Sequence, residues 1–222
     1  MARHGGSRAG QWPVQLRHET AHTSEEYVSH EGWRNATLAR CPLHPGGGCG
    51  FARHATYARV WPAGMRVARF YCPLGRVTFS LLPDCLASRF SGSLDALEAT
   101  VVAVEESRAA GATMEAAAAA VRPEVDVVIA LRWVYRRLTP IRQAVRTLET
   151  VMPLLAGAAG QLSSVRSKLA TKRALVSLRS MASPHTPQLP PPLGYGPRVR
   201  RRRSRRRRSQ HETGADPPPG KR

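Results

Sequence analysis

The chain has 222 residues, enough for one domain or two small ones. It carries 34 lysine and arginine residues against 15 aspartates and glutamates, which gives a formal net charge of +19 at pH 7. This balance indicates a polyanionic partner, with nucleic acid ahead of an anionic membrane surface. No uncharged apolar run approaches the ~20 residues that a transmembrane helix needs, so we expect no membrane span.

Residues 1–40 mix histidine, glycine, serine and charged residues without a sustained hydrophobic period, and we expect them to be mostly disordered. A short helical turn is predicted over residues 24–29. Because the chain opens with polar and basic residues rather than an apolar signal region, we expect a cytoplasmic protein, associated with the nucleoid if it binds DNA. Its thiols are then reduced, so clustered cysteines indicate a metal site rather than disulfides.

Residues 41–90 form a predicted β segment that contains all four cysteines. Three stretches have the alternation of short strands: TYARVW (56–61), MRVARFYC (65–72) and RVTFSLL (76–82). The Pro-Ala-Gly sequence between the first two predicts a hairpin turn. Cys85 follows the last strand, between leucines, and we expect it to be a buried thiol.

The cysteines and histidines of this segment predict a metal site. Cys41 and Cys49 bracket a turn rich in proline and glycine, and Cys72 ends the second predicted strand. Structural zinc takes four ligands in a tetrahedron, so a fourth ligand is needed, from His44 or from His54. We assign Cys41, His44, Cys49 and Cys72 as the ligands and zinc as the cofactor. A segment of about 40 residues buries too little apolar surface to be stable alone, so the metal would supply folding free energy.

The order of these motifs resembles the N-terminal zinc ribbon of bacterial transposon-associated, transposase-like proteins, in which a helix-turn-helix follows the ribbon. One position departs from the family pattern: where the second knuckle usually closes with a cysteine or a nearby histidine, this chain has Gly75 and Arg76. The resemblance extends over residues 41–140 and implies a zinc-ribbon-like fold followed by a DNA-binding helical unit. The matching residues are Cys41-Pro42, the His54-x-x-Tyr57-x-Arg59 motif, residues 64–72 and residues 78–83.

Residues 91–182 form the predicted helical domain. Ser93 and Thr113 are the expected N-caps of its first two helices, since each precedes a run with apolar residues three and four apart or an alanine-rich run. Pro140 is expected to end or kink the third helix. The expected helices span residues 94–110, 114–121, 126–138, 140–155 and 161–181.

The first three helices, within residues 93–138, match a helix-turn-helix of the homeodomain-like kind. An ordinary helical bundle whose third helix has a solvated basic face is the alternative. In a helix-turn-helix the third helix enters the major groove, so we expect Arg132, Trp133, Arg136 and Arg137 to contact DNA.

Residues 183–222 are proline-rich and then arginine-rich, and we expect this tail to be disordered until a polyanion neutralises it. Its binding to phosphates would be independent of sequence and strongly dependent on salt. Arginines of the predicted strands would contact phosphates as well. The arginines assigned to these contacts are Arg53, Arg59, Arg66, Arg69, Arg200, Arg201, Arg202, Arg203, Arg205, Arg206, Arg207 and Arg208.

The sequence therefore predicts an α+β fold, with a small zinc-ribbon-like β segment, a mainly helical, helix-turn-helix-like domain and disordered termini. No glycine-rich phosphate loop, Ser-His-Asp order or HExxH motif is present, so we expect no enzyme. The leading hypothesis is a non-catalytic protein of mobile-element type that binds duplex DNA. The alternatives are a protein-interaction module with an incidental basic tail, and an RNA-binding protein that uses Phe70, Tyr71 and Phe79.

Overall fold

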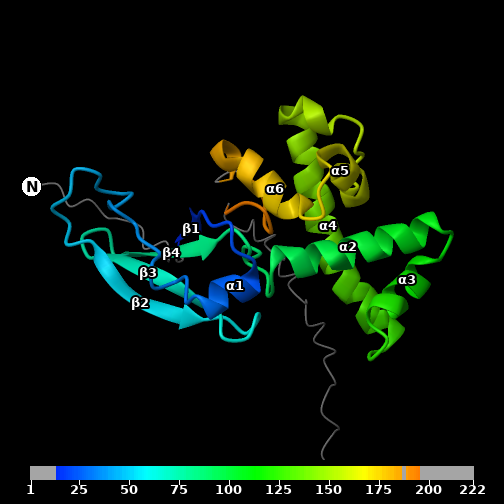
Figure 1. Cartoon of the computed structure of the whole chain (residues 1–222), viewed down its shortest axis with the longest axis horizontal. Coiled ribbons are helices and arrows are strands. Elements are labelled where there is room, and N and C mark those ends of the chain that lie inside the picture. The colour runs from blue at the N-terminus through cyan, green and yellow to red at the C-terminus, as the bar shows by residue number, and fades with distance from the viewer. Residues whose placement is uncertain (1–13, 187–188, 196–222) are drawn as a thin grey trace, which may run out of the picture.

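The computed structural model describes residues 14–186 and 189–195. Figure 1 shows two lobes: a sheet lobe of four strands and helix α1, and a helical lobe of helices α2 to α6. We define the sheet lobe as residues 14–92 and the helical lobe as residues 93–186. The mixture of sheet and helices agrees with the α+β fold class predicted from the sequence.

The sheet has the strand order β1-β4-β3-β2. β2 (Ala52–Ala58), β3 (Arg66–Cys72) and β4 (Val77–Pro83) pair antiparallel as successive hairpins, while β1 (Val14–His18) lies parallel to β4 at the edge. Alternation predicts the three hairpin strands, although β2 begins earlier in the chain than the predicted residue 56. One register shift interrupts the pairing of β2 with β3 near its start.

Strand β1 corrects the prediction that residues 1–40 are mostly disordered. A stretch of five residues is too short to show a period, and it becomes a strand because β4 offers an edge with which to pair. Arg17 of β1 fixes this pairing, since its guanidinium donates to both carboxylate oxygens of Asp84 at 2.8 to 3.1 Å. Such a bidentate contact is among the stronger polar contacts in proteins.

Helix α1 (Ser24–Ser29) lies at the residues predicted for a helical turn. It begins with a capping box, in which the Thr23 and Glu26 side chains each accept a hydrogen bond from the other's backbone N–H. Its Tyr27 side chain packs with Trp33 on one face of the sheet. The opposite face is covered by the loop that precedes β2. Both faces of the central strands β3 and β4 therefore carry buried apolar residues, while most of β2 is exposed.

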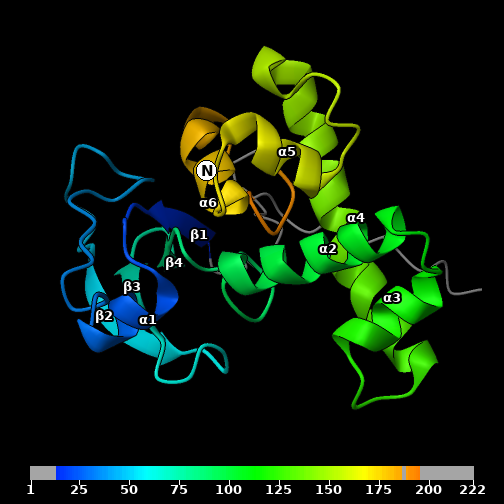
Figure 2. The ribbon, with the colours of Figure 1, turned by 45° about the vertical axis from the view of Figure 1, so that its right-hand side comes forward.

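The helical lobe begins with α2 (Leu94–Ala109), α3 (Met114–Val121) and α4 (Val127–Val151). The hydroxyl oxygens of Ser93 and Thr113 accept backbone N–H groups at the starts of α2 and α3, so both expected N-caps are confirmed. Figure 2 shows α2 leading away from the sheet lobe toward α3 and α4. None of the helices in the described ranges is long and apolar enough to cross a membrane.

Helix α4 corrects one of the two outcomes predicted for Pro140, because the third helix does not end at this residue. It runs for 25 residues with Pro140 inside it, and so joins the predicted helices over 126–138 and 140–155. A proline in a helix interior removes one backbone hydrogen bond and costs about 3 kcal/mol. Buried positions continue with helical spacing on both sides of the proline, and their burial offsets this cost. These positions are Ala130, Val134, Leu138, Ile141, Ala144, Val145 and Leu148.

The predicted single helix over residues 161–181 is also wrong, because two short helices replace it. After the 3₁₀ turn η1 (Pro153–Leu155), α5 (Leu162–Leu169) ends where Ala170 adopts a left-handed backbone conformation, with φ of 48°. α6 (Ala174–Met181) follows. Neither α5 nor α6 has an N-terminal side-chain cap of its own, so the N–H groups at both starts need another partner.

Helix α2 supplies that partner. The carboxylate of Glu105 accepts the first two backbone N–H groups of α5, and the carboxylate of Glu98 accepts the first two of α6, at 2.8 to 3.2 Å. Two full turns of α2 separate these glutamates, which places them on one face. Burial raises the pKa of Glu98, while its hydrogen bonds to α6 and the charge of Arg166 act in the opposite direction. The two carboxylates thus satisfy N–H groups that would otherwise be unpaired at the starts of α5 and α6.

A buried arginine joins the two lobes. Arg179 of α6 has no exposed surface, and its guanidinium lies 5.4 Å from the centre of the Tyr195 ring. It donates hydrogen bonds to four backbone carbonyls, two that follow β4 and two in residues 189–195. The four acceptors belong to Asp84, Leu86, Pro192 and Leu193.

Residues 183–186 and 189–195 correct part of the predicted disorder of the tail. The 3₁₀ turn η2 (Ser183–His185) follows α6, and Leu189 and Leu193 are buried in the helical core. Tyr195 is buried against the sheet lobe. The arginine-rich residues 198–208, to which the sequence assigns phosphate contacts, lie outside the described residues.

Candidate metal centre

Four side chains converge at the end of the sheet, where β3 finishes. Cys41, His44 and Cys49 come from the loop before β2, and Cys72 is the last residue of β3. Their ligand atoms all lie within 4.8 Å of one another. The Nδ1 atom of His44 is 3.6 Å from the Sγ of Cys41 and 3.3 Å from the Sγ of Cys72. The sequence prediction that these four residues cluster is confirmed.

The loop before β2 brings its three ligands together through its turns. The N–H of His44 donates to the carbonyl of Cys41 at 3.2 Å, which forms a tight turn between these two ligands. Gly47 and Gly48 then adopt positive φ angles of 85° and 76°, a conformation that favours glycine. This glycine turn reverses the chain, so that Cys49 returns to the cluster.

The turn after β3 places the backbone of Gly75 against the cluster. The N–H of Gly75 donates to the Sγ of Cys72 at 3.2 Å. A Cβ atom at Gly75 would lie 2.6 Å from the Cδ1 of Leu43 and 3.3 Å from the same Sγ. Leu43 is 50% exposed and its Cδ1 is the end of a flexible side chain, so this contact alone does not exclude a side chain at residue 75. The fourth candidate ligand atom belongs to His44.

Two other candidate ligands lie elsewhere. His54 is exposed on β2, and its ring is 5.8 Å from that of Tyr71, centre to centre. The open choice between His44 and His54 therefore falls to His44. Cys85 is fully buried behind the opposite sheet face, as expected, and burial raises its pKa to about 12. It stays a neutral thiol at physiological pH and contributes to packing.

The electrostatics of the cluster suit a cation. Burial alone would raise the pKa of Cys41, but hydrogen bonds from the His44 ring and from backbone N–H groups outweigh it and lower that pKa to about 7. Burial and the neighbouring sulfurs raise the pKa of Cys49. All three sulfurs are buried, so ionising them together requires a compensating positive charge.

The donor set fits zinc. Three thiolates and one imidazole form a Cys3His set, which is typical of structural zinc. Sulfur and nitrogen ligands of a tetrahedral zinc lie about 3.5 Å apart, and the two sulfur–nitrogen distances to His44 are 3.3 and 3.6 Å.

Comparisons of the chain with protein-family models, with curated proteins and with solved structures found no significant match. The assignment of a zinc site therefore depends on the identity and spacing of these four side chains.

Of the third-helix side chains predicted to contact DNA, two are exposed and two pack against the protein itself. Arg132 and Arg136 are exposed. The guanidinium of Arg137 instead lies 3.5 Å from the centre of the Trp133 ring, and Arg122 approaches the same ring at 4.7 Å. Burial, followed by the charge of Arg122, lowers the pKa of Arg137 to about 10. Trp133 and Arg137 thus pack against their own lobe.

The strand arginines that the sequence predicted to contact phosphates also differ in whether they are exposed or contact their own lobe. Arg59 donates to the backbone carbonyls of Ala87 and Phe90. Arg69 lies over the ring of Tyr57, 4.3 Å from its centre. Of Arg59, Arg66 and Arg69, Arg66 alone is exposed. The side chains of Arg59 and Arg69 therefore make contacts within the sheet lobe.

Helix α4 carries a polar surface of which the sequence analysis found only Arg132 and Arg136. Exposed polar residues recur three or four apart from residue 132 to residue 150, on both sides of Pro140. The helical spacing of polar residues continues across Pro140, and this signal could have predicted the surface. It was overlooked because the helix was expected to break at the proline. We call this surface the α4 stripe, and its members are Arg132, Arg136, Thr139, Gln143, Arg146, Thr147 and Thr150.

Proposed function

We propose that Cys41, His44, Cys49 and Cys72 hold one Zn²⁺ ion with a structural role. Four protein ligands leave no open position for a substrate or an activated water, which distinguishes structural from catalytic zinc. The ion would link the loop before β2 to the end of β3 and balance the charge of the buried thiolates. What zinc supplies here is folding free energy.

We further propose that the protein binds duplex DNA through the α4 stripe without catalysing a reaction. The observation that carries this proposal is that the stripe contains arginine, threonine and glutamine but no acidic residue. Glu149 is the sole acid of α4, and its carboxylate accepts the N–H of Gly160 beside the helix. Arginine and glutamine can bind base edges in the major groove, and arginine and threonine can bind phosphates.

The distribution of ion pairs among the arginines also supports α4 as the DNA-binding surface. Arg17, Arg34, Arg122, Arg166 and Arg173 each form an ion pair with a carboxylate. Among the residues that the structure describes, the five arginines of α4 form none. Positive charge left uncompensated along one helix creates a field that attracts a polyanion.

The arrangement of the helices is compatible with a helix-turn-helix. The short α3 precedes α4, residues 122–126 connect them, and both pack against α2. In such a motif the N-terminal half of the last helix meets base edges, which assigns this role to Arg132 and Arg136. The tail arginines would add contacts that do not depend on sequence. A place among mobile-element proteins follows from the sequence resemblance alone.

An RNA-binding role for the strand aromatics has less support. Phe70 and Phe79 are 6% and 2% exposed and belong to the apolar cluster around the cysteines, so their rings are not available to stack on bases. Tyr71 is only half-buried. Duplex binding by α4 is the function that the described surface favours.

A charge-matched pair of double variants tests the proposal. We expect Arg132→Ala with Arg136→Ala to weaken binding to a mixed-sequence duplex about tenfold or more, because two contacts to phosphates or bases are lost. Lys168→Ala with Lys172→Ala removes the same charge from exposed positions off α4 and should change affinity about twofold or less. Fluorescence anisotropy at fixed salt measures both. Equal effects from the two double variants would show that α4 is not the contact surface.

A further inference from the structure

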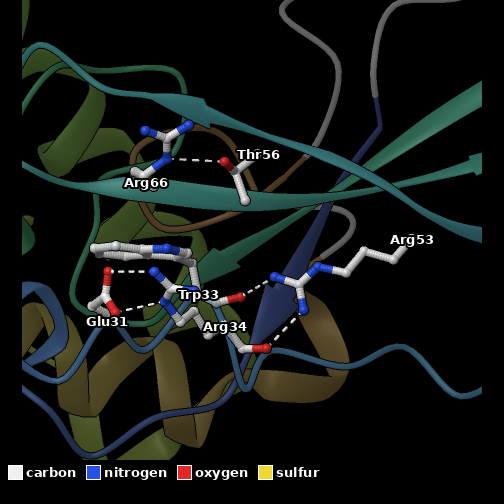
Figure 3. Close-up of a pocket in the computed structure, with 6 residues that line it drawn as sticks. All are labelled: Glu31, Trp33, Arg34, Arg53, Thr56 and Arg66. Carbon is white, nitrogen blue, oxygen red and sulfur yellow. Dashed lines mark hydrogen bonds and ion pairs between the residues drawn. The ribbon is translucent and has the colours of Figure 1, made fainter.

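A second basic surface lies in the sheet lobe, away from α4. A cleft of about 510 Å³ opens beside β2 and β3, and three of its six lining residues are arginines. Figure 3 shows Arg66 and Thr56 above the Trp33 ring, the Glu31–Arg34 pair below it, and Arg53 reaching in from the side. Glu31 is the only acid among these six. The cleft therefore carries a net positive charge.

Two of the three arginines are held in place by the lobe. Both carboxylate oxygens of Glu31 pair with the guanidinium of Arg34, which neutralises one positive charge. The terminal amino groups of Arg53 donate to the backbone carbonyls of Trp33 and Arg34. Backbone carbonyls orient the guanidinium but do not neutralise it, so Arg53 contributes a fixed positive charge.

Arg66 has donors that the described residues leave unused. Its Nε donates to the Oγ1 of Thr56 at 2.9 Å, and its two terminal amino groups have no partner among the described residues. Because Thr56 accepts this bond, its own hydroxyl proton remains free to donate. Two amino groups in a planar fork beside a hydroxyl donor match the oxygens of a phosphate group.

We propose that this cleft is a phosphate-binding site, with Arg66 and Thr56 as direct donors and Arg53 as the fixed neighbouring charge. Taking the phosphodiester backbone of DNA as the ligand rests on the proposed function above. The sheet lobe would then contact the duplex at a point separate from α4. Two linked contact surfaces bind one polymer more tightly than either alone, because the second contact forms within the complex.

The salt dependence of duplex affinity tests this site in the full-length protein. We expect Arg66→Gln to weaken binding to a mixed-sequence duplex about three- to tenfold and to reduce the slope of log affinity against log salt by about 0.9, the value for one lost phosphate contact. Thr56→Val should weaken binding less and leave the slope nearly unchanged. Arg40→Gln removes the same charge from an exposed position of the same lobe and should leave the slope within error of the wild type.

A small anion distinguishes the polymer from other phosphate sources. Pyrophosphate titrated into the ¹⁵N-labelled protein should shift the indole N–H signal of Trp33, assigned with Trp33→Phe, and Arg66→Gln should abolish that shift. A pyrophosphate shift lost in Arg66→Gln with an unchanged duplex slope would overturn the assignment to DNA in favour of a small phosphate ligand. If Arg66→Gln and Arg40→Gln behave alike in both assays, the site is overturned. That result would leave the α4 proposal standing, because the Arg132 and Arg136 double variant tests it separately.

Discussion

The sheet lobe and the helical lobe are stabilised by different means. The helical lobe has one continuous apolar core, built from α2 to α6 and the segment 189–195. The sheet lobe has two small apolar clusters, one on each face of a four-stranded sheet. Its cysteine–histidine cluster lies within one of these, beside the sheet end. A small lobe with divided cores needs a further crosslink, and the metal site would supply it.

The lobes also differ in how they use charged residues. Helix α2 places Glu98 and Glu105 inside the helical lobe as caps for α5 and α6. In the sheet lobe, Arg59 binds the backbone carbonyls of Ala87 and Phe90. A charged side chain that is fully occupied inside the fold is not available to a ligand. The remaining exposed and unpaired arginines are therefore the ones to test for function.

Loss of a zinc ligand should have the largest effect, confined to the sheet lobe. Structural zinc in small domains binds with an apparent free energy of roughly 10 kcal/mol or more at neutral pH. We expect Cys72→Ser to abolish stoichiometric zinc and to broaden or collapse the sheet-lobe amide signals in ¹H–¹⁵N spectra, while those of α2 to α6 persist. Cys85→Ala, a buried cysteine outside the cluster, should retain one zinc per chain. Retention of the sheet-lobe signals in metal-free protein would contradict this role for the ion.

Replacing the buried arginine between the lobes should have the next largest effect. Arg179→Met leaves four backbone carbonyls without their donor, and we expect a loss of about 3–5 kcal/mol of unfolding free energy. Since these carbonyls lie on both sides of the junction, thermal unfolding should separate into two transitions. Arg173→Met removes a partly exposed ion pair with Asp95 and should cost about 1 kcal/mol or less. A single transition with unchanged midpoint in Arg179→Met would show that the lobes are coupled elsewhere.

Removing a carboxylate cap should have a smaller effect, limited to the helical lobe. Glu98→Ala leaves two N–H groups of α6 and the partner Arg166 unsatisfied, and we expect about 2–3 kcal/mol of destabilisation in urea. Glu106→Ala, on an exposed position of the same helix, should change stability by about 0.5 kcal/mol or less. Metal content should stay at the wild-type value in both variants. Equal stabilities would mean that the α6 cap contributes little.

Local signals in the sequence predicted local structure well. Ser93 and Thr113 precede helices that they cap, and the alternation of residues 65–72 and 76–82 corresponds to β3 and β4. The clustering of Cys41, His44, Cys49 and Cys72 follows from residue type and spacing, because few side chains bind metal and the turns limit which of them can meet. In each case the residues that determine the local structure lie close together in the sequence.

The failures come from contacts between distant residues. Pro140 has an unfavourable local preference for a helix interior, which burial along α4 offsets. Val14–His18 becomes a strand only through β4, and α5 and α6 begin where glutamates of α2 lie. The packing of residues 189–195 depends on Arg179. None of these partners is adjacent in the sequence, so composition and period did not reveal them.

X-ray absorption at the zinc edge, on protein purified without added chelator, measures the ligand set of this centre. We expect one zinc per chain with three sulfur ligands at about 2.3 Å and one nitrogen ligand at about 2.0–2.1 Å, and His44→Ala should remove the nitrogen contribution. A spectrum with fewer than three sulfurs, or one in which His44→Ala leaves the nitrogen contribution unchanged, would contradict the assignment of this centre.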